Sequence, residues 1–91
     1  MEYEKKLNAA EVFKALSNPL RLSIVKLLTE SEKMNVTAIY KNLDIKQAIA
    51  SHQLNILRNK NILLAERKGK KTFYSLKHPQ IAEAIDLVVG I

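Results

Sequence analysis

The amino-acid sequence predicts a mainly α-helical fold that carries one small β-hairpin. Apolar residues recur at helical spacing over most of the chain. Two short runs, over 62–66 and 72–76, are typical of strands and flank a basic loop that contains a single Gly at position 69. The chain has 91 residues, which is the length of one small domain. We therefore expect a single domain over residues 1–91.

The first two helices are predicted to meet at Asn18 and Pro19. A helix over about 3–16 has an apolar face that consists of Leu7, Ala10, Phe13 and Leu16. Asn18 suits the N-cap of the next helix, and Pro19 suits its first position, where a missing N–H costs nothing. The second helix is apolar on most sides, so we expect it to be central.

A helix-turn-helix is predicted over about 36–58. Asn35 can cap a short helix over 36–43, and a longer helical segment over 45–58 follows the turn. At about 100° per residue, the apolar half of this segment contains Ile45, Ile49, Ala50, Leu54, Ile56 and Leu57. The other half contains Gln47, Ala48, Ser51, Asn55 and Arg58, with His52 at its boundary. Gln53 lies on the apolar side and needs a hydrogen-bond partner if it is buried.

The outer half of the second helix and the hairpin both favour DNA. Short polar side chains can reach base edges in a major groove, and Gln can bind adenine through two hydrogen bonds. The hairpin, over about 62–76, places four cations in five positions at its tip: Arg67, Lys68, Lys70 and Lys71. A solvated turn is the plainer interpretation, but repulsion among four like charges is relieved when an anion binds. We therefore expect the hairpin to contact phosphates, with Arg58 and Lys60 contributing and Tyr74 bracing its exit strand.

Composition and charge exclude several classes of function. Fifteen Lys and Arg against nine Asp and Glu give a net charge of +6, which favours a polyanionic partner. The chain has no Cys, so disulfides, thiolate nucleophiles and Cys-ligated metals are excluded. His52 and His78 lie on different predicted elements, without a carboxylate pair at ligand spacing. We therefore predict no enzyme activity, no metal and no cofactor. No apolar run approaches the roughly 18 residues of a membrane span, and the N-terminus lacks the apolar stretch of a secretory signal, so a cytoplasmic protein is expected.

The last predicted helix, over about 80–89, indicates a second copy of the chain. Seven of the nine residues from 81 to 89 are apolar, so this helix needs cover on more than one side. An isologous dimer through the first and last helices would supply it, whereas a frayed apolar tail is the alternative. The expected dimer contacts are Leu7, Ala10, Phe13, Ile81, Ala84, Ile85 and Val88.

Three motifs resemble those of the ArsR/SmtB family of bacterial and archaeal regulators. FKALSNPLRLSIVKLL at 13–28 resembles the ALADPTRLRILxLL opening of the family. LDIKQAIASHQLNILR at 43–58 resembles the recognition segment LGLSQSTVSHHLKVLR, and the hairpin at 67–76 is similar to REGRWVYYRL. Over about residues 10–80, the resemblance implies a winged helix-turn-helix repressor that is homodimeric and often releases DNA on sensing a metal or oxidant. It places Gln47, Ala48, Ser51 and His52 at positions that contact bases and backbone.

The chain departs from the family pattern at its sensor sites. The two thiolates of the family's CVC motif fall on Asn35 and Thr37, which are not soft-metal ligands. If His78 is the first His of the family's zinc site, Leu76 replaces its Asp and Val89 its second His. We therefore expect both metal sites to be absent. The family's Ser N-cap is Lys46 here, so we expect Asp44 to cap the recognition helix instead.

The sequence therefore predicts a repressor that binds an inverted-repeat operator as a homodimer. We expect this repressor to act without a metal, and its effector is unknown. Its recognition helices would lie about 34 Å apart in successive major grooves. Two alternatives remain open: a winged-helix module whose basic hairpin meets an acidic protein, and a repressor that responds to a small organic effector in the dimer interface. The predicted DNA contacts are Lys46, Gln47, Ala48, Ser51, His52, Asn55, Arg58, Lys60, Arg67, Lys68, Lys70, Lys71 and Tyr74.

Overall fold

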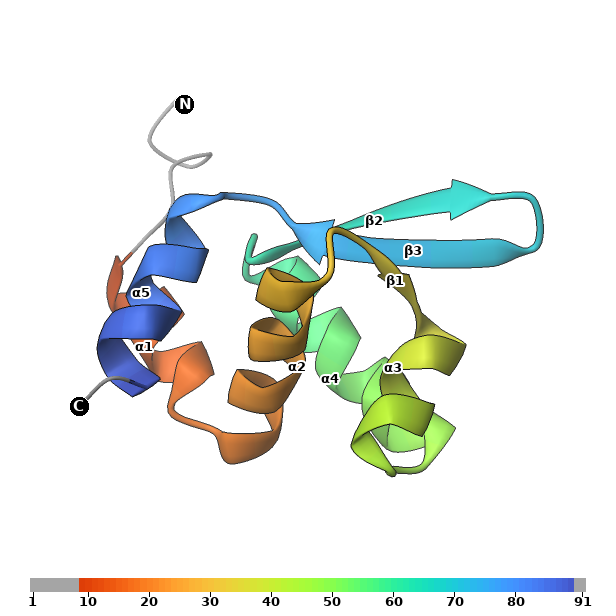
Figure 1. Cartoon of the computed structure of the whole chain (residues 1–91), viewed down its shortest axis with the longest axis horizontal. Helices are drawn as coiled ribbons and strands as arrows, with labels where there is room; N and C mark the ends of the chain where they lie inside the picture. Colours follow the sequence, from red (N-terminus) through yellow and green to blue (C-terminus); the bar gives the residue numbers. More distant parts are fainter. Residues whose placement is uncertain (1–8, 90–91) are drawn as a thin grey trace.

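The computed structural model describes the backbone of residues 9–89 and the side chains of residues 9–87 (Figure 1). The elements follow in the order α1 (Ala9–Leu16), α2 (Pro19–Glu30), β1 (Met34–Asn35), α3 (Val36–Leu43), α4 (Gln47–Asn59), β2 (Leu63–Lys68), β3 (Lys71–Leu76) and α5 (Gln80–Val89). The predicted mainly helical fold with a β-hairpin is confirmed. Leu7, expected in the first helix, lies outside the described residues.

Two asparagines start helices as the sequence predicts. The side chain of Asn18 accepts the backbone N–H groups of Leu20 and Arg21, both at 3.0 Å, and Pro19 is the first residue of α2. Asn35 caps α3 by accepting the N–H of Ala38 at 2.8 Å. Each side-chain oxygen satisfies an amide that has no acceptor within the first turn of its helix.

The sheet has three antiparallel strands in the order β1-β3-β2. In the hairpin, Leu63 pairs with Leu76 and Lys68 with Lys71, so both strands extend further toward the tip than predicted. Gly69 has a φ of 64° at the tip, a left-handed conformation that Gly adopts without strain and that lets the two strands stay paired up to a tight turn. The sequence did not predict β1, which pairs Met34 with Tyr74 and Asn35 with Phe73. This strand attaches the hairpin to the start of α3.

Helix α2 lies at the centre of the helical part, between α1 and α5 on one side and α3 and α4 on the other (Figure 1). Its side chains Ile24, Val25 and Leu28 are buried in one core cluster with residues of α1, α3, α4, β2 and α5. The described residues include no buried polar or charged residue. The expectation that the second helix is central is therefore confirmed.

Helix α4 buries a narrower stripe than its sequence predicts. Ala50, Leu54 and Leu57 are all 0% exposed. Ile49, expected on the apolar half, is instead 43% exposed. The buried stripe is centred on Ala50, Leu54 and Leu57, so Ile49 falls at its margin, beyond the reach of the core.

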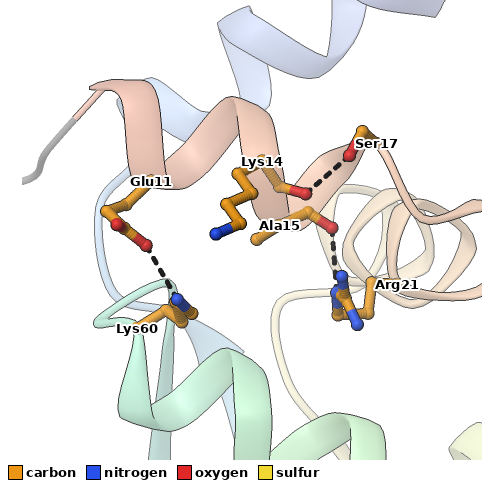
Figure 2. Close-up of polar contacts among 6 residues, drawn as sticks. All are labelled: Glu11, Lys14, Ala15, Ser17, Arg21 and Lys60. Atoms are coloured by element: carbon orange, nitrogen blue, oxygen red, sulfur yellow. Dashed lines mark hydrogen bonds and ion pairs between the residues drawn. The ribbon is translucent and has the colours of Figure 1, made fainter.

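Arg21 joins α1, α2 and α4 through its guanidinium group. Its Nε donates a 2.9 Å hydrogen bond to the carbonyl oxygen of Ala15 near the end of α1 (Figure 2). Its Nη1 donates to Oε1 of Gln53 on α4 at 3.2 Å. This is the partner that Gln53 was expected to need, so Arg21 satisfies one carbonyl and one amide at a partly buried junction of three helices.

A second polar contact joins α1 to the end of α4. Lys60 Nζ donates to Oε2 of Glu11 at 2.7 Å (Figure 2). The hydrogen bond from Lys60 and its positive charge lower the pKa of Glu11 below the ordinary value of 4.5. Both side chains are exposed, so the pair adds little to folding stability, but it marks where the C-terminal end of α4 lies against α1.

We expect Arg21→Met to lower the free energy of unfolding by about 1–3 kcal/mol, because it leaves Ala15 O and Gln53 Oε1 without their donor. Urea denaturation measures this change. Lys26→Met is the matched control, since Lys26 is an exposed cation on the same helix. A loss of stability no larger for Arg21→Met than for Lys26→Met would contradict the role given to the guanidinium.

Candidate nucleic-acid interface

A groove of about 330 Å³ lies between the start of α3, the start of α4 and the β2–β3 hairpin. In Figure 1 the hairpin extends past the helices on the same side as α3. The lining residues come from all three parts and are Asn35, Val36, Thr37, Gln47, Ser51, Arg67, Lys70, Lys71, Thr72 and Tyr74. The groove therefore brings two predicted base-contacting residues of α4 together with the cations of the hairpin.

Sequence reasoning missed the α3 side of this groove. Asn35, Thr37 and Thr72 line it but were not among the predicted contacts. Their position follows from β1, whose residue Asn35 pairs with Phe73 and so places the start of α3 beside the hairpin. A strand of two residues is too short to show the alternation of apolar and polar residues from which strands are predicted.

The cations of the hairpin are divided into two groups by Glu66. Lys68 Nζ lies 3.3 Å from Glu66 Oε1, and Lys33 Nζ lies 4.0 Å from the same oxygen. The hydrogen bond to Glu66 raises the pKa of Lys68 above its ordinary value. Within residues 9–87, Lys70 and Lys71 have no ion pair, and both line the groove. The positive charge of the groove thus comes mainly from Lys70 and Lys71, with Arg67 beside them.

Arg67 bends back onto the tip of the hairpin. Its Nε donates a 3.1 Å hydrogen bond to the carbonyl oxygen of Gly69. This contact fixes the orientation of the planar guanidinium group, and Arg67 also lines the groove. Arg67 therefore combines a local role in the turn with a position that an anion can reach.

The other predicted DNA contacts on α4 lie on its outer face, outside the groove lining. Lys46, Ala48, His52, Asn55 and Arg58 are exposed, whereas Ser51 is half-buried. Gln47 and Ser51 form the flank of α4 that faces the hairpin. A duplex that contacted this face would meet short polar side chains along most of the length of α4.

The start of α4 differs from the prediction. Asp44 was expected to cap α4, but it is the C-cap of α3, with a left-handed φ of 53°. Its N–H bonds back to the carbonyl oxygen of Lys41 at 3.3 Å, so its position is set by the end of α3 and not by the start of α4. Lys46 is the N-cap residue, and its side chain makes no capping hydrogen bond. The first amides of α4 therefore have no acceptor from the N-cap side chain.

Tyr74 and Lys60 lie in different surroundings. Tyr74 is half-buried, packs against the core cluster and lines the groove, opposite Met34 on one neighbouring strand and Ala65 on the other. The expected bracing of the hairpin by Tyr74 stays a prediction. Lys60 contacts Glu11 at the far end of α4 and does not line the groove.

A second surface runs between α1 and α5 and is apolar. A pocket of about 230 Å³ there is lined by Ala9, Val12, Phe13, Gln80, Ile81 and Ala84. Phe13 is 57% exposed, and Leu87, which was not among the expected dimer contacts, is 74% exposed. Ala10 is exposed and Ala84 half-buried. These residues leave an apolar surface uncovered on the two helices predicted to form a dimer.

Two of the expected dimer contacts belong to the core of the chain itself. Ile81 and Ile85 are 0% and 1% exposed. In a helix that is apolar on most sides, the sequence does not reveal which residues face the core, and these two form the inner stripe of α5. The side chain of Val88 lies outside the described part of the chain.

The described residues offer no metal centre. Among them, no three His, Cys, Asp or Glu side chains gather closely enough to hold a metal ion. Nε2 of His78 is buried and has no hydrogen-bond partner among the described residues. Within residues 9–89, no helix is both long and apolar enough to cross a membrane.

Comparison with known proteins identifies the family. The sequence profile described as "Bacterial regulatory protein, arsR family" matches residues 18–65, which include α2, α3, α4 and the start of β2. An uncharacterized HTH-type transcriptional regulator of Methanocaldococcus jannaschii is 42% identical over 87 residues, which cover 96% of this chain and 94% of that protein. The transcriptional repressor PagR of Bacillus anthracis is 33% identical over 97% of this chain and 88% of its own length.

Solved structures give the same result for the fold. The crystal structure of PagR superposes with a TM-score of 0.80 and covers 97% of each chain. A homodimeric winged helix-turn-helix DNA-binding domain from Mycobacterium bovis superposes with a TM-score of 0.80 at 28% identity, over 98% of this chain and 79% of that chain. The predicted winged helix-turn-helix is thus confirmed, and a family of regulatory proteins agrees with the expectation that the chain is not an enzyme. The chain belongs to the ArsR family of bacterial regulatory proteins.

Proposed function

We propose that the chain is a transcriptional repressor that binds an inverted-repeat operator as a homodimer. The groove carries this proposal, because it joins Gln47 and Ser51 of α4 to Lys70 and Lys71 of the hairpin, which form no ion pair within residues 9–87. Hydrogen-bonding side chains beside cations match the major-groove edge of a duplex and its adjacent phosphates. The similarity to PagR, which is a transcriptional repressor, supports repression as the outcome.

The residues of the interface divide by chemistry into two roles. Gln47 can bind adenine through two hydrogen bonds, and Ser51 can bind to several base edges, with His52 and Asn55 further along the outer face. Phosphates are the natural partners of the exposed cations Lys46, Arg58, Arg67, Lys70 and Lys71. Lys60 and Lys68 are left out of this second group because Glu11 and Glu66 hold their ammonium groups.

The surface between α1 and α5 is the proposed contact between two copies. Phe13 and Leu87 expose large apolar side chains there, and a second copy would cover them through the same surface. The Mycobacterium bovis relative is described as homodimeric, which supports this arrangement. A twofold axis would place the two α4 helices about 34 Å apart, which is one turn of B-DNA.

The proposed repressor does not sense metals or oxidants through the sites of its family. The whole chain lacks Cys. Asn35 stands at one thiolate position, and its side-chain oxygen already accepts the N–H of Ala38 as the cap of α3. Leu76 and Val89 stand where the α5 zinc site would need a carboxylate and an imidazole.

Fluorescence anisotropy with the DNA upstream of the chain's own gene, against a scrambled duplex, tests the proposal directly. We expect a sub-micromolar Kd for the upstream DNA, two chains per site, and an affinity that falls steeply with salt. Zinc and EDTA should leave the Kd unchanged. Equal, weak binding to both duplexes would overturn the repressor function and favour a protein-partner module, and a zinc-dependent Kd would contradict metal independence.

Substitutions in the groove should separate the two roles. Gln47→Ala should cost about 1–3 kcal/mol on the upstream DNA and little on the scrambled duplex. Lys70→Ala should weaken binding to both duplexes alike and reduce the salt slope by about one. Lys26→Ala removes an exposed lysine of α2 that does not line the groove and should change neither. The division of roles is refuted if Gln47→Ala and Lys70→Ala lose the same affinity on both duplexes.

A charge at the proposed dimer surface should produce monomers. Phe13→Glu places a carboxylate on an apolar surface where two copies would bury it, so sedimentation velocity should show a monomer, and circular dichroism should show unchanged helical content. Leu64→Glu is the control, because Leu64 is 47% exposed but lies on β2 and does not line the pocket between α1 and α5. A Phe13→Glu protein that remains dimeric would place the dimer contact elsewhere.

A further inference from the structure

The outer face of α4 contains an exposed isoleucine that is not among the predicted DNA contacts. Ile49 is 43% exposed, although it is the third residue of a helix whose inner stripe is completely buried. The preceding residue, Ala48, is also exposed. An isoleucine exposed to water gives up part of the roughly 25 cal/mol per Å² that burial of its apolar surface would provide. The pair therefore gains stability when a partner covers it.

The position of Ile49 on the helix indicates which partner. Residues three apart are neighbours on a helix surface, so Ile49 lies beside His52 on the outer face. Gln47 lies on the opposite flank, toward the hairpin and its cations. The first turn of α4 thus presents a polar group on the hairpin side and an apolar group on the other side.

The charge of the surface that α4 shares with the hairpin favours a nucleic acid over an apolar protein surface. Lys46 is exposed one turn before it, and Lys70 and Lys71 lie across the groove beside Gln47. In the major groove of DNA the C5-methyl of thymine is the apolar group on the base edges, and small apolar side chains recognise thymine by contact with it. An exposed apolar residue within a basic, polar surface therefore fits a thymine.

We propose that Ile49, together with Ala48, contacts the C5-methyl group of a thymine in each half of the operator. This inference rests on the proposed DNA-binding function and adds a specificity-determining residue to it. With Gln47 on adenine, each half-site would contain an adenine and a thymine that are read by neighbouring residues of the same helical turn. The specificity for thymine would come from one methyl group and not from a hydrogen bond.

Deoxyuridine in place of thymidine provides the test, because it removes this methyl group and leaves base pairing intact. The probe is the shortest duplex from the upstream region that wild-type protein binds selectively, with each thymine in turn replaced by uracil in both half-sites. At one pair of symmetric positions we expect the wild-type Kd to rise about fourfold per half-site, or roughly sixteenfold in total, which is the factor for about 0.8 kcal/mol per methyl group.

Variants of Ile49 decide whether this residue makes the contact. Ile49→Ala should bind the thymine and uracil duplexes with nearly equal Kd, and Ile49→Val should show an intermediate ratio. Leu64→Ala, which shortens a similarly exposed side chain on β2, should keep the full wild-type ratio. Circular dichroism of each variant checks that its fold is unchanged, as expected for substitutions at exposed positions.

The outcomes distinguish this inference from the function on which it rests. If wild-type protein binds selectively but no thymine responds to loss of its methyl group, the role of Ile49 is overturned and the repressor function stands. The same conclusion follows if Ile49→Ala remains as sensitive to uracil as wild-type protein. If wild-type protein binds no duplex selectively, both the function and the role of Ile49 are overturned.

Discussion

The burial of one face of α4 is the constraint on which the rest of the interface depends. Ala50, Leu54 and Leu57 have no exposed surface, so the helix cannot rotate without opening the core. Removing one such leucine side chain typically costs about 2–5 kcal/mol. Arg21 adds a polar restraint at the edge of this face through Gln53. Because the inner face is fixed, the direction in which Gln47 and Ser51 point is fixed as well.

The hairpin is stabilised by packing and strand pairing at its base, whereas like charges repel one another at its tip. Its base is packed through Tyr74 and paired with β1, while its tip contains several cations within a few residues. Glu66 reduces their mutual repulsion by pairing with Lys68, on the part of the hairpin that does not line the groove. Lys70 and Lys71 lie on the groove side. One carboxylate thus directs the positive potential of the hairpin toward α4.

Local signals in the sequence predicted most of the fold. Asn18 with Pro19, Asn35 and Gly69 each specify a helix start or a turn by their own chemistry, and the structure agrees at all of them. The predictions failed where tertiary packing determines which residues are buried or paired. A helical wheel gives the angles of Ile49, Ile81 and Ile85 but not which arc the core covers. Likewise, neither the pairing of β1 nor the left-handed Asp44 is encoded by periodicity, since one needs a distant strand and the other ends the preceding helix.

Asn35 belongs to two elements at once, and this affects how the protein opens. Its backbone pairs with Phe73 of the hairpin, while its side chain holds the first turn of α3 through the N–H of Ala38. Separation of β1 from β3 would displace the residue that caps α3, so the edge of the sheet and the start of the helix form one cooperative unit of local unfolding. The protected amide hydrogens of both would then report the same free energy of opening. A movement of the hairpin large enough to break this pairing would be accompanied by fraying of α3.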